Sequence, residues 1–341
     1  MSTETREAHA VWFAAPRLAE VRAEPVRPPG RGEVLVRAHV SLISAGTELV
    51  VYRGRADPTD PLPKYAGGDY GFPIKYAYQV VGVVEEGGPD APAPVGARVF
   101  VRHPHQDLMV VDERDRGIVR IPDGITDDQA AFLNLARVAH TAIIDSPLRA
   151  GDTAVIYGAG IVGLICARFA QRTAHRVIVV DPRPARRELA LRRGATAAVA
   201  PEDLPAAVEE LGRSRGADVC FETSGVGAAL QSAIDVTGQE GTIVVVSYYG
   251  REPVGIRLAP EFHWRRPKII SSHASVLSYD LPRWDATRRN EEVFAAMSYL
   301  VVEELISHRF PLAEAADAYR MLDGAATEPS DVVGAVIDYP A

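Results

Sequence analysis

Three glycines with the spacing GxGxxG, Gly158, Gly160 and Gly163, form the pattern in this chain that points most directly to chemistry. They follow the apolar run 153–157 and open a helix-like pattern. In such a turn the first glycine permits the tight bend and the second lets the backbone approach a pyrophosphate. The third glycine lets the helix pack closely against the sheet. This spacing predicts a phosphate-binding turn between a strand and a helix.

An acid follows at the distance that this kind of turn requires. A second apolar run, residues 176–180, ends in Asp181, which gives the order strand, turn, helix, strand, acid. That order is the dinucleotide-binding fingerprint, in which the carboxylate accepts hydrogen bonds from a ribose. The free N–H groups at the start of the helix, at Ile161 and Val162, would face the phosphates. The sequence therefore predicts a bound dinucleotide.

The charge next to the ribose favours NAD over NADP. A 2′-phosphate would meet the Asp181 carboxylate, which repels it. Arg183, Arg186 and Arg187 follow closely and could hold such a phosphate, so NADP stays the less favoured alternative.

Composition sets the class of protein. The chain has 341 residues, of which 47% are hydrophobic and 24% charged, and this is ordinary globular composition with room for two domains. Its net charge of −8 gives no general attraction to nucleic acid or to membrane surfaces. No apolar run is long enough to cross a bilayer, and the first residues lack the pattern of a secretory signal. The chain has only two cysteines, so we expect a reduced, cytoplasmic protein. We expect it to act on a small molecule.

The pattern of elements changes along the chain. Residues 33–40, 79–85 and 97–101 alternate apolar and polar side chains between Pro- and Gly-rich turns, which predicts a β-rich first domain. From residue 126 to about 272 helical and strand patterns alternate, which predicts a parallel sheet covered by helices. We expect domain boundaries at 1–134, 135–272 and 273–341.

Two stretches carry a family resemblance. Residues 158–195 and 216–225 resemble the medium-chain dehydrogenase/reductase superfamily, and the likeness covers essentially the whole chain. Residues 43–48 and 283–289 look most like the branch that contains bacteriochlorophyllide hydroxyethyl dehydrogenase. The resemblance implies a GroES-like β-barrel catalytic domain, to which the last segment returns, and a doubly wound Rossmann domain. It also implies a homodimer joined at Rossmann sheet edges, for which 242–247 is the expected edge strand.

The zinc ligands of the superfamily are replaced here. The resemblance places Ala45, Tyr78 and Asn134 where zinc-dependent members carry their metal ligands. Catalytic zinc is held by three residues drawn from His, Cys, Asp and Glu, so Ala and Tyr cannot serve. We therefore expect no metal and a zinc-independent enzyme.

Polar residues gather at the positions that the metal would occupy. The resemblance assigns to Thr47 the hydroxyl that relays a proton, and Tyr78 could donate a hydrogen bond or act as a general acid. The alternative for Tyr78 is a buried aromatic that fills the space left by the metal. Gln79 and Glu48 could orient the substrate or each other, and a structural role for Glu48 is equally open.

Further candidates lie at the domain junction and along the cofactor. Asn134 and Arg137, one helical turn apart, would lie near the nicotinamide and could meet the substrate. The resemblance implies that the cofactor also meets Arg186 near the adenosine ribose and the residues after the fourth and fifth Rossmann strands: Thr223, Ser224, Ser247 and Tyr248. His103 and His105 could chelate a metal ion, but we expect them to belong to a polar loop facing the cleft. We expect His140 to be a satisfied core histidine.

These observations favour a zinc-independent, NAD-dependent oxidoreductase that interconverts a secondary alcohol and a ketone. The polar residues expected at the site favour a sugar, cyclitol or natural-product substrate. Two alternatives stay open: reduction of an activated carbon–carbon double bond, and a dinucleotide-binding protein without catalytic activity.

Overall fold

The chain divides into two compact units. The structure, a computed structural model, describes residues 5–60, 68–91, 93–112, 118–212, 215–249, 254–275, 282–325 and 331–340. One unit combines residues 1–134 with residues 301–341, and the other is the continuous stretch 135–300. Residues 273–300, expected in the returning C-terminal segment, belong to the second unit.

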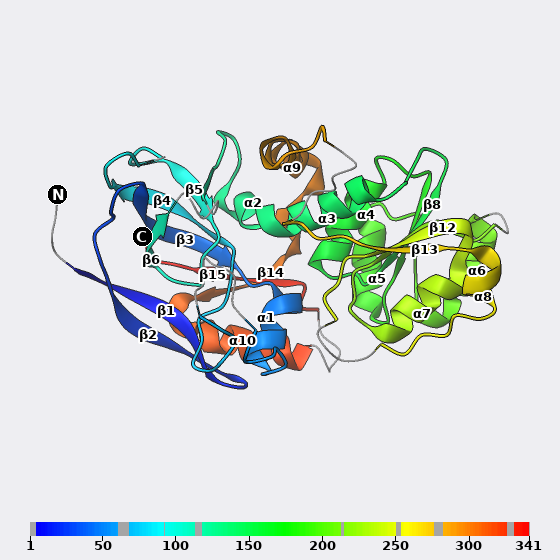
Figure 1. Ribbon diagram of the computed structural model, residues 1–341, viewed down its shortest axis with the longest axis horizontal. Helices are drawn as coiled ribbons and strands as arrows, with labels where there is room; N and C mark the ends of the chain where they lie inside the picture. The colour runs from blue at the N-terminus through cyan, green and yellow to red at the C-terminus, as the bar shows by residue number, and fades with distance from the viewer. Residues whose placement is uncertain are drawn as a thin grey trace. The chain divides into compact units, whose positions relative to one another are not determined.

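The second unit is built on a parallel sheet (Figure 1). Its strands are β8 (Thr153–Tyr157), β9 (Arg176–Val180), β10 (Ala197–Val199), β11 (Ala217–Glu222), β12 (Thr237–Val245) and β13 (Lys268–Ser271). Within the described residues they lie in the order β10-β9-β8-β11-β12-β13, and every pairing is parallel. All five residues of β8 are buried, as expected for a strand that is covered on both faces. The order reverses between β8 and β11, and such a switch point is where ligands bind in open parallel sheets.

Helices connect these strands. They are α3 (Leu133–Asp145), α4 (Ile161–Ala170), α5 (Pro184–Arg192), α6 (Leu204–Leu211), α7 (Gly227–Val236), α8 (Glu261–Arg265) and α9 (Ala286–Leu300), with the short 3-10 turn η2 (Pro201–Asp203). Helix α4 packs on β8 and β9, and α7 packs on β11 and β12. This is the strand–helix alternation that the sequence predicts.

The first unit is a mainly antiparallel sheet structure. Its strands are β1 (Arg6–Ala15), β2 (Leu18–Val26), β3 (Glu33–Leu42), β4 (Val80–Gly87), β5 (Arg98–Val101), β6 (Leu108–Asp112), β7 (Ile118–Arg120), β14 (Ile306–Pro311) and β15 (Gly334–Asp338). Its helices are α1 (Ala45–Tyr52), α2 (Asp127–Ala131) and α10 (Ala315–Ala325), with the 3-10 turns η3 (Val302–Leu305) and η4 (Leu312–Glu314). The main sheet runs β14-β15-β3-β4-β5-β7, with β6 also paired to β3, while β1 and β2 form a separate pair.

Segments from both ends of the chain build the core of this unit. Strand β15 pairs with β3, so that Val336 lies opposite Leu42. The rings of Phe13, Tyr52 and Tyr319 contact one another, with centroid separations from 4.9 to 5.5 Å. The C-terminal segment therefore completes the sheet and the core that the first 134 residues begin.

The structure confirms a Rossmann-type parallel sheet and a separate antiparallel sheet unit. The expectation that residues 242–247 form the sheet edge is wrong, because β12 pairs with β11 on one side and with β13 on the other. Within the described residues the two edges of this sheet are β10 and β13. No helix in the described part of the chain is long and apolar enough to span a membrane.

Candidate functional site

The glycine turn has the geometry that a phosphate needs. Gly158 has φ +94°, a conformation that residues with a side chain rarely adopt. A Cβ on Gly163 would lie 1.8 Å from the Gly158 carbonyl oxygen, so the helix can pack here only without a side chain. A Cβ on Gly160 would meet no protein atom within 4 Å, which leaves the backbone at the start of α4 open to a ligand. Ile161 and Val162 form the first turn of α4, as predicted.

Asp181, directly after β9, and Arg186, in α5, both hold this turn. The Asp181 carboxylate accepts hydrogen bonds from the Ala159 N–H at 2.8 Å and from the Arg183 N–H at 2.9 Å. Arg186, which is 8% exposed, donates from Nη1 to the Ala159 carbonyl oxygen at 2.9 Å. Burial lowers the pKa of Arg186, and the nearby Asp181 charge opposes that shift. A carboxylate has about four lone-pair sites, so Asp181 keeps acceptor capacity for a ribose.

The residues predicted after β11 and β12 lie beside the same turn. The Thr223 hydroxyl donates to the Tyr157 carbonyl oxygen at 2.7 Å, across the top of β8. Ser224 and Ser247 both donate to the buried carboxylate of Glu222. Tyr248 is 65% exposed. The second unit thus brings its predicted cofactor residues together at one end of the sheet.

In the first unit, Tyr78 belongs to a polar network around Ser44 and Glu48. Its partly buried phenol donates to the Ser44 hydroxyl at 2.6 Å. The fully buried Glu48 carboxylate accepts from the Ser44 N–H at 2.8 Å and also from the hydroxyl of Tyr319. The loop before α1 is therefore fixed by a carboxylate on the helix, and Tyr78 is fixed by that loop.

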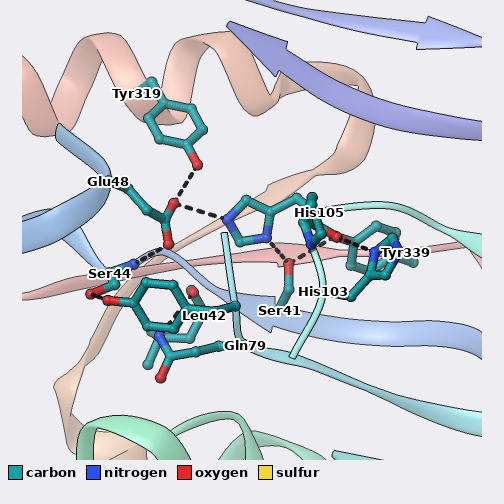
Figure 2. A network of polar contacts seen from close by, with 11 residues as sticks. Ser41, Leu42, Ser44, Glu48, Gln79, His103, His105, Tyr319 and Tyr339 are labelled. Carbon is teal, nitrogen blue, oxygen red and sulfur yellow. Dashed lines mark hydrogen bonds and ion pairs between the residues drawn. The ribbon is translucent and has the colours of Figure 1, made fainter. Parts of the chain in front are cut away.

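His105 extends this network from Glu48 to Ser41 and Tyr339. His105, 1% exposed, places Nε2 3.1 Å from Oε2 of Glu48 and Nδ1 2.7 Å from the Ser41 hydroxyl. Ser41 in turn lies 2.8 Å from the Tyr339 hydroxyl. Figure 2 shows the Glu48 carboxylate between the Tyr319 hydroxyl and the His105 ring. The sequence predicts a polar loop facing the cleft here, but His105 is buried within the first unit, where both its ring nitrogens have partners.

The phenol of Tyr78 is held in its protonated form. Burial, assisted by the Glu48 charge, raises the pKa of Tyr78 to about 12, while the hydrogen bonds of its phenol with Ser44 and Thr47 oppose the shift. Two hydroxyl groups therefore adjoin the phenol and would stabilise a phenolate formed there. The structure places Thr47, Tyr78 and Glu48 in one cluster, as the sequence predicts.

Gln79 is fully buried next to this cluster. Its Nε2 donates to the Leu42 carbonyl oxygen at 3.3 Å, whereas its Oε1 has no hydrogen-bond partner among the described residues. An unsatisfied buried acceptor costs about 1–3 kcal/mol. The amide therefore offers an acceptor to a ligand hydroxyl or a water.

The residues present do not fit a catalytic zinc ion. Ala45, Tyr78 and Asn134 occupy the three expected ligand positions, and neither Ala nor Tyr is a usual zinc ligand. Across the described ranges, no three His, Cys, Asp or Glu side chains are grouped as metal ligands. We derive no chemistry from a metal.

The helix α3 holds the two candidates at the predicted junction. Arg137 is 8% exposed, and its Nε donates to the Asn290 side chain at 2.7 Å, which ties α3 to α9. Asn134 lies at the start of the same helix, one turn earlier. His140, expected to be a satisfied core residue, has a buried Nδ1 without a partner among the described residues, and burial lowers its pKa to about 4. The expected hydrogen bonding is therefore wrong: the rings of Phe169 and Trp284 contact the imidazole and cannot satisfy its Nδ1.

Three residues of these clusters were not among the predicted site residues: Ser44, Tyr319 and Glu222. Glu222 carried a signal, because it is a carboxylate at the end of an otherwise apolar strand. The contacts of Ser44 with Tyr78 and of Tyr319 with Glu48 join segments that are distant in the sequence.

Comparisons with known proteins agree with this geometry. A sequence model of the zinc-binding dehydrogenase family matches residues 162–287. The chain is 30% identical over 326 residues to D-guloside 3-dehydrogenase of Escherichia coli (strain K12), covering 89% of this chain and 93% of the relative. It is 28% identical over 327 residues to 2-dehydro-3-deoxy-L-galactonate 5-dehydrogenase of Pseudoalteromonas atlantica, covering 87% of this chain and 89% of the relative. The crystal structure of 2R,3R-butanediol dehydrogenase from Bacillus subtilis superposes with a TM-score of 0.79 at 20% identity, covering 98% of this chain and 100% of that chain.

The chain belongs to the zinc-binding dehydrogenase family of medium-chain dehydrogenases/reductases. It is an NAD(P)-dependent alcohol dehydrogenase, which removes the alternative of a protein without catalytic activity.

Proposed function

We propose that this enzyme is a zinc-independent, NAD-dependent dehydrogenase that interconverts a secondary alcohol and a ketone on a sugar-like substrate. The observation that carries the proposal is the Tyr78 phenol, hydrogen-bonded to Ser44 where a zinc ligand is expected. The named relatives act on a guloside and on a galactonate derivative, which supports a polyhydroxylated substrate.

Tyr78 supplies the proton in this proposal. A bound nicotinamide dinucleotide supplies or accepts the hydride. During ketone reduction the phenol donates its proton to the developing alkoxide, and Ser44 and Thr47 stabilise the resulting phenolate by hydrogen bonding. During alcohol oxidation the same oxygen takes the proton back.

Two neighbours complete the arrangement. Glu48 is a positioning residue, because its oxygens are bound to Ser44, His105 and Tyr319 in the interior and reach the reaction only through Ser44. Gln79 Oε1 is buried and has no partner among the described residues, so an enclosed water beside the cluster would satisfy it.

The Tyr78 role is tested by Tyr78→Phe in single-turnover assays with NADH and keto-glycosides. We expect hydride transfer to slow by about 100-fold or more, since general acid catalysis contributes about 10²–10⁴-fold. NADH affinity should stay unchanged. Tyr52→Phe is the matched control, because its hydroxyl donates to the Arg17 carbonyl oxygen in the same unit, outside the network. An unchanged transfer rate in Tyr78→Phe removes Tyr78 from the mechanism. When an α,β-unsaturated ketone is the substrate, a saturated ketone product in place of an allylic alcohol supports alkene reduction instead.

Zinc independence needs its own measurement. The purified enzyme is assayed for metal content and for activity after dialysis against a chelator. We expect full activity with far less than one zinc per chain. Stoichiometric zinc whose removal abolishes activity and whose return restores it contradicts the proposal.

We also propose a homodimer joined through β13. This strand is one of the two edges of the described sheet, opposite β10, and it exposes Lys268, Ile269 and Ser271. An exposed edge with an apolar side chain is a template for pairing with a second copy. Light scattering on Ile269→Lys should show a monomer if β13 forms the interface, and an unchanged dimer rejects that interface.

A further inference from the structure

We infer that Glu222 is a positioning residue that shapes the nicotinamide half of the cofactor site. The inference rests on dinucleotide binding by the second unit. It concerns a side chain that the fingerprint does not include and that is fully buried at the end of β11.

The Glu222 carboxylate accepts hydrogen bonds from donors in two loops. Oε1 of Glu222 accepts from the Ser224 N–H at 2.7 Å, from the Ser224 hydroxyl and from the Gly225 N–H at 3.1 Å. Oε2 accepts from the Ser247 hydroxyl at 2.7 Å and from the Tyr249 hydroxyl at 2.6 Å. Ser224 and Gly225 follow β11, while Ser247 and Tyr249 follow β12. The conformations of the two loops are therefore set by a single side chain.

The same carboxylate reaches the glycine turn through Ser224. A Cβ on Gly158 would lie 3.2 Å from the Ser224 Cβ, so the turn and the β11 loop are in close contact. The Glu222 carboxylate thus holds in place the loop after β11, and this loop contacts the turn after β8. Three neighbouring loops at the carboxyl end of the sheet form one assembly.

The place of this assembly in the sheet indicates which half of the cofactor it meets. A dinucleotide lies across the switch point, with its two halves on opposite sides. Asp181 at the end of β9 marks the adenosine side, so the nicotinamide side falls over β11 and β12. The loops that Glu222 holds lie on that side.

A carboxylate suits this task because it accepts on both oxygens. Hydrogen bonds to a charged acceptor are about twice as strong as neutral ones. Burial and the Glu222 charge raise the pKa of the Tyr249 phenol, which therefore remains a donor at neutral pH. A glutamine in place of Glu222 turns one acceptor into a donor, which would face the hydroxyl groups of Ser247 and Tyr249 or the N–H groups of Ser224 and Gly225.

The test compares two ligands that differ in the nicotinamide ring. Binding of NADH and of ADP-ribose is measured by calorimetry for the full-length wild type, Glu222→Gln, Ser247→Ala and Tyr249→Phe. We expect Glu222→Gln to weaken NADH about tenfold, as for one lost charge-assisted hydrogen bond, while ADP-ribose changes by less than about twofold. Ser247→Ala and Tyr249→Phe, which remove one donor each and leave the carboxylate in place, should show the same selective loss to a smaller degree. In single turnovers the hydride-transfer rate should fall even at saturating NADH, because the ring is less well placed.

Asp218→Asn is the matched control. Asp218 lies at the other end of β11, where its carboxylate accepts from the Thr153 N–H at 2.8 Å. We expect this variant to bind both ligands as the wild type does. Equal weakening of NADH and ADP-ribose in the Glu222, Ser247 and Tyr249 variants, or no weakening at all, overturns the inference. A wild type that binds neither ligand contradicts the proposed function instead.

Discussion

His105 Nε2 lies 3.1 Å from Glu48 Oε2, and the two side chains are 1% and 0% exposed. The Ser44 N–H and the Tyr319 hydroxyl point at the same carboxylate. Glu48 is therefore an acceptor at the centre of three donors, and its loss leaves all three unsatisfied inside the protein. The geometry of Ser44, and with it that of Tyr78, depends on this buried carboxylate.

We expect Glu48→Gln to lower the free energy of unfolding by about 1–3 kcal/mol, because one buried donor then faces an amide N–H. Urea unfolding measures this loss. Glu20→Gln is the control: its partner is Arg22, both side chains are substantially exposed, and such a pair contributes about 0–1 kcal/mol. Equal small losses in the two variants would show that the Glu48 network does not stabilise the unit.

The two later glycines of the turn should respond differently to alanine. In Gly163→Ala the new methyl group meets the Gly158 carbonyl oxygen at 1.8 Å, so the helix must move and the fold itself is destabilised. In Gly160→Ala the methyl group meets no protein atom within 4 Å, and only a ligand can collide with it. We expect Gly160→Ala to melt near the wild-type temperature without cofactor and to lose most of the cofactor-induced rise. Thermal melts with and without NADH distinguish the two, and a full cofactor-induced rise in Gly160→Ala contradicts the expected approach of the pyrophosphate.

Asp181→Asn should shift the cofactor preference toward NADPH. The asparagine carbonyl can still accept from the Ala159 N–H, so the turn keeps its support while the negative charge is removed. We expect the ratio of kcat/KM for NADPH to that for NADH to rise by about tenfold or more, since the phosphate no longer meets a carboxylate. Wild type that already prefers NADPH, or a ratio that does not change, contradicts the NAD assignment.

His140 should make the second unit sensitive to acid. Burial lowers the pKa of its ring from 6.5 to about 4, so the unfolded chain takes up the proton first as the pH falls. The stability that a neutral His140 contributes is present above about pH 6.5 and is lost as the pH falls toward 4. Each pKa unit corresponds to about 1.4 kcal/mol. We expect His140→Leu to flatten the decline in unfolding free energy between about pH 6.5 and 4, whereas His175→Leu, an exchange at a histidine outside this aromatic pocket, should leave the slope unchanged. Parallel slopes in wild type and His140→Leu would rule out His140 as the source.

The nucleotide-binding turn could be predicted because its information is local. Gly158, Gly160, Gly163 and Asp181 fall within 24 residues, and strand and helix periodicity places them without knowledge of the rest of the chain. Thr47, Glu48 and Tyr78 were predicted through the family resemblance instead.

The remainder depends on contacts between distant segments. Glu48 meets Tyr319 across 271 positions, and Ser41 meets Tyr339 across 298, distances over which periodicity carries no information. The edge strand was misplaced for a related reason. Which strand lies at the edge depends on pairing, and the pairing of β12 with the four-residue strand β13 is seen only in the folded sheet.

The two units differ in the order in which their strands are synthesised. Residues 135–300 emerge as one uninterrupted stretch, so all strands of the parallel sheet are available before synthesis ends. Strand β3 pairs with β15, and the residues of β15, 334–338, are synthesised some 290 residues after β3. We therefore expect the nucleotide-binding unit to fold during translation, while the unit that carries Tyr78 matures only once β15 has left the ribosome. A nascent chain that stalls before β15 leaves residues 40–42 of β3 without their β15 partners, and it is then a target for chaperones.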